Sequence, residues 1–136
     1  MKTQIVPPFT AASAKEKVQR AEDLWNKQDP KKISMAYSED SEWRNRGLIF
    51  KGRKNIVSFL ISKWQKENQY KLKKDLFSFT DNKIAVDFIY EYQSENSVWF
   101  RAYGNEHWEF NSDGLMTKRD ASINDVAISV QDRMLR

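Results

Sequence analysis

The chain has 136 residues and a formal net charge of +4, with 40% hydrophobic and 31% charged residues, which is typical of one globular domain with its own core. The basic residues are scattered among acidic ones, which argues against nucleic-acid binding, and no apolar run is long enough to span a membrane. The absence of cysteine and the single histidine, His107, exclude thiolate chemistry and histidine-rich metal centres.

The N-terminal segment, residues 1–9, is expected to be an extended arm of a single domain that covers residues 1–136. Pro7-Pro8 resists helix formation, which favours an extended backbone there. The segment lacks the apolar core of a signal peptide, and this absence predicts a cytoplasmic protein.

Three helices are predicted in the first half of the chain. Apolar residues recur every three or four positions in the first and third of them, and Asp29-Pro30 is typical of an N-cap followed by proline at the first helical position. The predicted helices cover residues 11–27, 30–38 and 54–67. A short strand over 42–46 is expected between the last two, with Trp43 and Asn45 on the same face.

After residue 69 the hydrophobic period changes from that of a helix to the alternation of β-strands. Turn residues divide this half into four segments, which favours an antiparallel meander. The predicted strands cover residues 70–79, 84–93, 98–110 and 115–124. Helices that precede a meander predict an α+β fold, in which a curved antiparallel sheet wraps around the three N-terminal helices.

The strand over 98–110 carries one carboxylate on an otherwise apolar face. Alternation places Glu106 on the same face as Trp108, where an unpaired buried charge would be very costly. The next strand offers Arg119 as a partner. A four-residue loop over 111–114 would put Arg119 directly opposite Glu106, whereas a two-residue turn would make it a diagonal neighbour.

Two uses of this pair remain open. In the structural use, Arg119 only neutralises Glu106 inside the sheet. In the functional use, the pair lies at the floor of a pocket and orients a ligand or a water molecule.

The opposite face of the sheet is polar with aromatic interruptions. Its expected members are Arg44, Arg46, Trp99, Arg101, Tyr103 and His107. Aromatic residues together with arginine are typical of the core of a protein interface, so this outer face is expected to join two subunits of a homodimer. An anion site, or His107 as a general base, is the alternative for this face.

The element order and several strings resemble the nuclear transport factor 2-like superfamily, also called SnoaL-like. The strings are Trp25-Asn-Lys-Gln-Asp-Pro30, Tyr37-Ser-Glu-Asp-Ser41, Gly52-Arg-Lys-Asn-Ile56 and Asp113-Gly114. Three further strings look like one uncharacterised subfamily: Glu42-Trp-Arg-Asn-Arg46, Tyr103-Gly-Asn-Glu-His-Trp-Glu-Phe110 and Ala121-Ser-Ile-Asn-Asp125. The resemblance implies a cone-shaped sheet around three helices, a pocket between them, and commonly a homodimer through the outer face of the sheet.

Two enzyme groups of this superfamily allow a comparison residue by residue. The positions that hold the general-base Asp, an oxyanion-hole Asp and the oxyanion Tyr of ketosteroid isomerases fall on Asn45, Glu106 and Ala21. Because asparagine cannot take a proton at neutral pH, isomerisation by the same residues is not expected. Limonene epoxide hydrolases hold a water with a Tyr-x-Asn pair and an Asp-Arg-Asp relay. Trp43-x-Asn45 supplies the Asn, and Glu106 with Arg119 supplies one carboxylate and the Arg of the relay.

The sequence therefore predicts a protein that binds a small apolar molecule with a polar group in an aromatic-lined pocket. In one form of this hypothesis it is a hydrolase, isomerase or dehydratase that needs no cofactor and no metal. The expected ligand-binding residues are Trp43, Trp108 and Asn45, and the expected catalytic residues are Glu106, Asn45 and Arg119. The alternative is a non-catalytic binding or protein-interaction module in which Glu106 and Arg119 form a structural ion pair.

Overall fold

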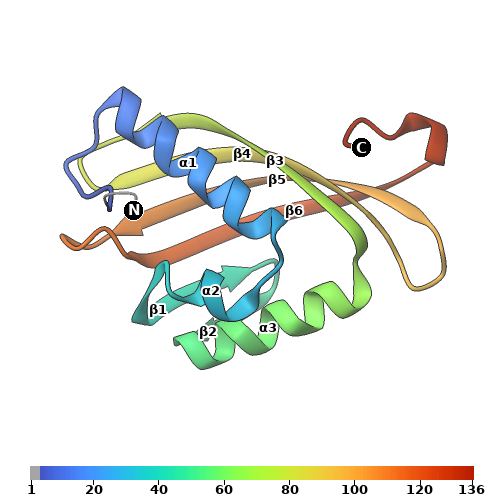
Figure 1. Ribbon diagram of the computed structural model, residues 1–136, viewed down its shortest axis with the longest axis horizontal. Coiled ribbons are helices and arrows are strands. Elements are labelled where there is room, and N and C mark those ends of the chain that lie inside the picture. The colour runs from blue at the N-terminus through green and yellow to red at the C-terminus, as the bar shows by residue number, and fades with distance from the viewer. Residues whose placement is uncertain (1–3) are drawn as a thin grey trace.

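The computed structural model describes residues 4–136, which fold as three α-helices packed against one six-stranded sheet (Figure 1). Residues 1–3 of the predicted N-terminal arm lie outside the described residues. The helices are α1 (Ala11–Asn26), α2 (Pro30–Ser34) and α3 (Arg53–Lys66). The strands are β1 (Tyr37–Asn45), β2 (Leu48–Lys51), β3 (Asn68–Phe79), β4 (Lys83–Gln93), β5 (Trp99–Phe110) and β6 (Met116–Ile128). A short 3-10 helix, Val130–Asp132, follows.

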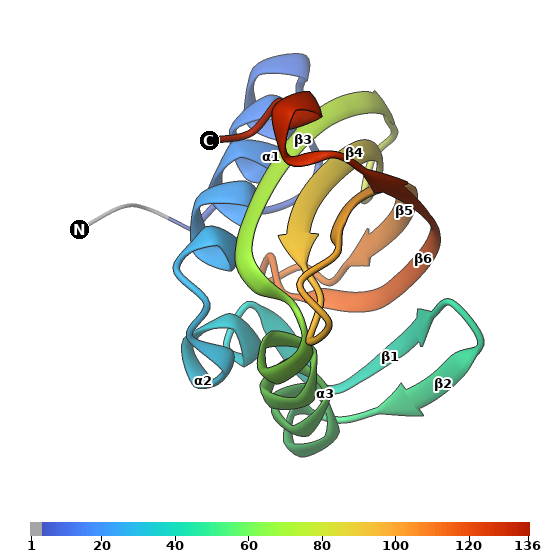
Figure 2. The same ribbon diagram turned by 90° about the vertical axis from the view of Figure 1, so that its right-hand side faces the viewer.

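The strands lie in the order β2-β1-β6-β5-β4-β3. Neighbouring strands are antiparallel except β1 and β6, which run parallel. Figure 2 shows β3–β6 arched around α1, with β1 and β2 beside α3. The predicted α+β fold, a curved sheet wrapped around three N-terminal helices, is therefore confirmed, and the one parallel pair makes the sheet mixed.

The helices begin where their capping residues predict. The Thr10 side chain accepts a hydrogen bond from the backbone N–H of Ser13, and the Ser13 hydroxyl accepts one from the backbone N–H of Thr10. Such a capping box satisfies two N–H groups that the first turn leaves unpaired. Asp29 caps α2 in a similar way, by accepting from the N–H of Lys32, and Pro30 occupies the first helical turn.

The segment between α2 and α3 differs from the sequence prediction. The helix expected to reach residue 38 ends at Ser34, and the strand expected at 42–46 already begins at Tyr37. β2 has no counterpart among the predicted strands. The difference comes from tertiary contacts. β1 lies between β2 and β6 and forms backbone hydrogen bonds with both, and strand formation depends strongly on such neighbours, which local sequence patterns do not reveal.

The expected placement of Arg46 on the outer face is wrong. Arg46 follows the end of β1 with a φ of 58°, and this left-handed backbone breaks the alternation of the strand. Its guanidinium lies 2.6 Å from the carboxylate of Asp125 and donates to the hydroxyl of Tyr90, which is buried in the core. Arg44 keeps the partly exposed outer position and pairs with Asp120.

The β5–β6 hairpin uses the register of the tighter turn. Trp108 pairs with Arg119 and Glu106 with Ala121, so Arg119 is a diagonal neighbour of Glu106 and not its direct partner. The register shifts once, next to Phe110 at the turn. From Trp99 to Glu109 the register is unbroken, and it keeps Glu106 and Arg119 on the same face, as both predicted registers require.

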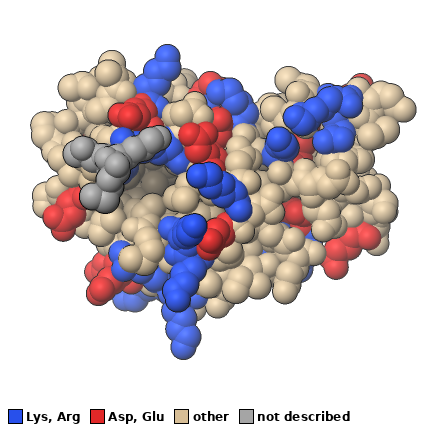
Figure 3. Space-filling view, viewed as in Figure 1, with Lys and Arg blue, Asp and Glu red and all other residues tan. Residues whose placement is uncertain are grey.

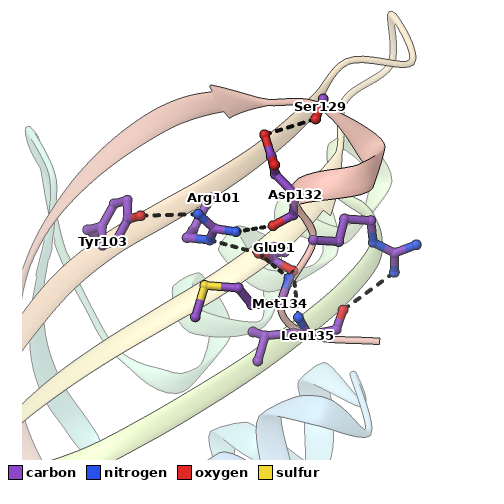
Figure 4. Close-up of polar contacts among 8 residues, drawn as sticks. Glu91, Arg101, Tyr103, Ser129, Asp132, Met134 and Leu135 are labelled. Carbon is purple, nitrogen blue, oxygen red and sulfur yellow. Dashed lines mark hydrogen bonds and ion pairs between the residues drawn. The ribbon is translucent and has the colours of Figure 1, made fainter.

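The C-terminal segment folds back over β4 and β5 (Figure 4). The buried carboxylate of Glu91 accepts hydrogen bonds from the backbone N–H groups of Met134 (3.0 Å) and Leu135 (2.8 Å). Arg101 donates to the same carboxylate through Nε at 2.8 Å, and also to the carbonyl oxygen of Asp132. One side chain of the sheet thus holds the end of the chain in place.

This fold-back covers part of the expected homodimer face. Trp99 and Arg101 are buried, and the guanidinium of Arg133 lies 3.9 Å from the ring centroid of Trp99. Tyr103 and His107 stay exposed. The homodimer therefore remains a prediction, with Arg44, Tyr103 and His107 as the accessible part of the predicted face.

Replacing Glu91 with glutamine should release the C-terminal segment while the sheet stays folded. The change removes a carboxylate that accepts charge-assisted hydrogen bonds, which contribute about 2 kcal/mol each. Amide hydrogen exchange at Met134 and Leu135 should become at least about tenfold faster. Glu95→Gln, in the exposed loop before β5, should leave both rates unchanged. Unchanged exchange in E91Q would show that other contacts hold the segment.

The same attachment should weaken in acid. Burial by itself raises the pKa of Glu91, but the N–H groups of Leu135 and Met134 and the Arg101 guanidinium outweigh it and hold the pKa below its usual value. A lowered carboxyl pKa stabilises the folded state above the pKa of the unfolded chain, about 4.3, and this stabilisation is lost as the pH falls through the lowered value.

Candidate functional site

A cluster of buried charges lies on the inner face of the sheet. Glu106, at 1% exposure, binds two cations: Arg119 through Nε, 2.6 Å from Oε2, and Lys74 through Nζ on Oε1. Arg119 also donates from Nη1 to Oδ1 of Asn45 at 3.0 Å. The three predicted catalytic residues are thus brought into contact, across β1, β6 and β5. Lys74, from β3, completes the cluster.

Sequence reasoning missed Lys74, although the sequence carries a signal for it. In β3, alternation places Lys74 on the same face as Tyr70 and Leu72, and all three are buried. A lysine on the apolar face of a strand requires a partner for the same reason that Glu106 does. Alternation therefore marks Lys74 as a candidate partner for a buried carboxylate, and the structure shows that this carboxylate is Glu106.

Aromatic rings surround the two cations of the cluster. The Arg119 guanidinium lies 4.5 Å from the ring centroid of Trp43 and 5.1 Å from that of Trp25. Lys74 Nζ lies 5.4 Å from the ring centroid of Trp108. The negative faces of aromatic rings attract cations, most strongly where water is excluded, so these rings offset part of the hydration that the buried cations lose.

The electrostatics of the cluster keep Glu106 ionised. Burial by itself raises the pKa of Glu106, but Lys74 and Arg119 outweigh burial and hold the pKa below its usual value. Burial lowers the pKa of Lys74, against the attraction of Glu106. A carboxylate bound by two cations is a weak proton acceptor, which suits it to orienting and stabilising charge more than to taking up a proton.

A cavity of about 360 Å³ lies beside this cluster, between α1, the segment after α2 and the β5–β6 hairpin. Its wall is mostly apolar and includes Leu24, Trp25, Tyr37, Trp108 and Phe110. Lys17, Arg20 and Asp113 add charged groups. Figure 3 shows a hollow in this side of the molecule, with basic and acidic side chains around it.

Of the predicted site residues, only Trp108 belongs to the wall of this cavity among the residues that the structure describes. The ring of Trp25, which also lines it, stacks on Trp43 at a centroid distance of 6.0 Å and contacts Arg119. Trp25 and Trp108 therefore stand between the cavity and the charge cluster. Trp43 and Arg119 border a second hollow, about 410 Å³, that crosses β2, β1 and β6.

Two indole N–H groups in this region are buried without a hydrogen-bond partner among the described residues. They belong to Trp43 and Trp108. A buried donor without an acceptor costs about 1–3 kcal/mol.

Within residues 4–136 no three His, Asp or Glu side chains are grouped so that they could hold a metal ion. His107, the alternative general base, is exposed and is not part of the wall of this cavity. No helix of the described chain is long and apolar enough to cross a membrane.

The sequence matches the profile of one family, described as "Protein of unknown function (DUF1348)", over residues 7–136. No curated protein matches the chain. The family match covers the charge cluster and the cavity wall except Gln4, and its description assigns no reaction to either.

Solved structures of other proteins share the architecture. The epoxide hydrolase/cyclase-like enzyme SalBIII, described in pyran ring formation in polyether salinomycin, has a TM-score of 0.73 and 14% identity, over 83% of this chain and 92% of that one. An NTF2-like protein of unknown function from Exiguobacterium sp. 255-15 has a TM-score of 0.70 and 16% identity, over 81% and 99%. RV0760c from Mycobacterium tuberculosis, in complex with estradiol-17beta-hemisuccinate, has a TM-score of 0.68 and 15% identity, over 82% and 93%. At these identities the similarity shows the fold alone.

Proposed function

Since the chain belongs to the DUF1348 family and has the nuclear transport factor 2-like fold, we propose that it binds a small, mostly apolar molecule with a polar group in the cavity beside α1. The observation that carries the proposal is the cavity of about 360 Å³ with its aromatic wall. Small-molecule sites typically have about 300–1,000 Å³, apolar walls and a few polar groups. One structural neighbour holds estradiol-17beta-hemisuccinate, and another is an epoxide hydrolase/cyclase-like enzyme, which supports a role with small molecules.

The three predicted ligand-binding residues would have different roles in binding the molecule. Trp108, whose side chain lines the cavity, would contact the ligand directly. Trp43 and Asn45 stand behind Trp25 and would hold the wall of the cavity in place, because Trp43 stacks on Trp25 and Asn45 accepts from Arg119. They would meet a ligand only after the Trp25 ring moves.

Catalysis without a cofactor, as a hydrolase, isomerase or dehydratase, is the second candidate. The observation that favours it is the hydrogen-bonded row Asn45–Arg119–Glu106, in which one guanidinium joins an amide and a carboxylate. We propose these three as the catalytic residues of such an enzyme. As a general base or acid, Glu106 would have to release Lys74 or Arg119 before it took a proton. The competing non-catalytic module predicts only a structural role for this row.

Filling the cavity should abolish binding. Ala21 lines it from α1, and a phenylalanine there would occupy the space of a ligand. Calorimetry with 2-naphthamide, a flat apolar probe with one polar group, should show at least about tenfold weaker binding to A21F than to the wild type, a loss of about 1.4 kcal/mol or more. Ala12→Phe, on the exposed side of the same helix, is the matched control and should bind normally. Equal binding by both variants would place the ligand elsewhere.

A further inference from the structure

We propose that the polar group of the molecule in this cavity is a carboxylate, and that Lys17 is the residue that binds it. The proposal rests on the proposed function and specifies the chemical class of its ligand. It is carried by the position of one ammonium group, by the charges near it and by the charge cluster behind the cavity wall.

The ammonium group of Lys17 is held from two sides. Nζ donates to the carbonyl oxygens of Gly114 at 2.8 Å and Ile5 at 3.3 Å, and it lies 5.1 Å from the ring centroid of Phe110. An ammonium has three N–H donors. With two of them directed to backbone carbonyls, the third is available to a ligand in the cavity that Lys17 lines. The group is therefore positioned before any ligand arrives, which lowers the entropy cost of binding.

Lys17 has no carboxylate partner within the described chain. None of the ion pairs between residues 4 and 136 includes it. Of the charged groups near it, Arg20 pairs with Glu16 at 3.2 Å, and Asp113 lines the same cavity from the hairpin. A half-buried ammonium that only neutral carbonyls bind would gain a charge-assisted hydrogen bond from a carboxylate ligand.

The inner side of the cavity is positive as well. Behind the rings of Trp25 and Trp108, the two cations Lys74 and Arg119 share the single carboxylate of Glu106. A cluster with more cations than carboxylates attracts an anion and repels an amine through a wall of low dielectric constant. The charge at both ends thus favours an acid over a neutral or basic molecule.

The protonation of Lys17 links binding to pH. Burial, with a further contribution from Arg20, lowers the pKa of Lys17 to about 8. A carboxylate beside the ammonium favours the charged form and raises this pKa, so binding is expected to take up protons above pH 7. The charged groups on the elements around Lys17 are Glu16 and Arg20 of α1 and Asp113 of the β5–β6 hairpin.

The test compares two probes of nearly the same shape, the anion 2-naphthoate and the neutral 2-naphthamide, by calorimetry on the full chain. At pH 7 the wild type should bind the acid about tenfold or more tightly than the amide, the effect of one charge-assisted hydrogen bond. In Lys17→Met this preference should disappear. Lys15→Met, an exposed position two residues away on α1, should keep it.

Measuring the affinity of the wild type for both probes at several pH values tests the role of Lys17 without any variant. Affinity for 2-naphthoate should fall at least about tenfold between pH 7 and 10, while affinity for 2-naphthamide stays constant. Equal binding of acid and amide, or a preference that survives in K17M, overturns the role of Lys17 and leaves the proposed function in place. If neither probe binds to the wild type, the proposed function fails, and this inference fails with it.

Discussion

Replacing Glu106 with glutamine is expected to lower the free energy of unfolding by about 3–5 kcal/mol, the cost of removing one partner from a buried ion pair. The carboxylate is bound by both Lys74 and Arg119, which are 5% and 3% exposed, so the variant leaves two cations in the core without a counter-charge. Because glutamine has nearly the same shape as glutamate, the loss of stability comes from the missing charge and not from altered packing.

Urea unfolding with linear extrapolation measures this loss. Glu109→Gln, on the same strand but outside the cluster, is the matched control and should change stability by no more than about 0.5 kcal/mol. Adding Lys74→Met to E106Q should recover part of the stability, because it removes one of the two surplus charges. An E106Q chain as stable as the wild type would contradict the electrostatic account of the cluster.

The same variant separates the two uses of the Glu106–Arg119 pair. If E106Q binds 2-naphthamide normally and only unfolds more easily, the pair is structural. If it unfolds like the wild type but loses binding or turnover, the pair is functional. The lowered pKa of Glu106 also predicts how stability changes with pH. The ionised carboxylate stabilises the folded state above the pKa of an unfolded glutamate, and this stabilisation is lost as the pH falls through the lowered value. E106Q should therefore lose less stability in acid than the wild type does.

Replacing Trp43 with alanine is expected to cost about 3–5 kcal/mol of unfolding free energy, as for other large core aromatics. Trp43 is 1% exposed, and its ring lies 5.0 Å from Tyr37 and 6.0 Å from Trp25 in centroid distance. It also covers the guanidinium of Arg119 at 4.5 Å. Alanine would open a cavity between β1 and α1 and remove the aromatic face that the cation meets.

Trp43→Phe is the informative control for this variant. It keeps an aromatic ring toward Arg119, and it sacrifices no hydrogen bond, because the indole N–H of Trp43 has no partner among the described residues. W43F should therefore lose less than half as much stability as W43A in urea unfolding. W43A should also weaken the binding of 2-naphthamide, since Trp43 supports the Trp25 side of the cavity wall. A W43A chain within about 1 kcal/mol of the wild type would show that the aromatic cluster repacks.

Much of the fold follows from local patterns in the sequence. The helix predicted over 11–27 is Ala11–Asn26 in the structure, because the spacing of apolar residues and the cap at its start are local properties. Alternation likewise placed Glu106 on the buried face of its strand, and hairpin geometry offered Arg119 as its partner. The start of β1 was not predictable in this way, since its hydrogen bonds come from a neighbour about 75 residues later.

The sequence by itself determined which side chains of β5 face inward and that a buried carboxylate needs a cation. Only the tertiary structure decided that Lys74 shares Glu106, because β4 lies between their strands and the contact crosses the concave face of a curved sheet. The curvature also set the rings of Trp25 and Trp108 between the charge cluster and the cavity, and brought Lys17 to the opposite side of that space. These contacts join distant parts of the chain, so periodicity along the sequence indicates which side chains face inward but not which of them meet.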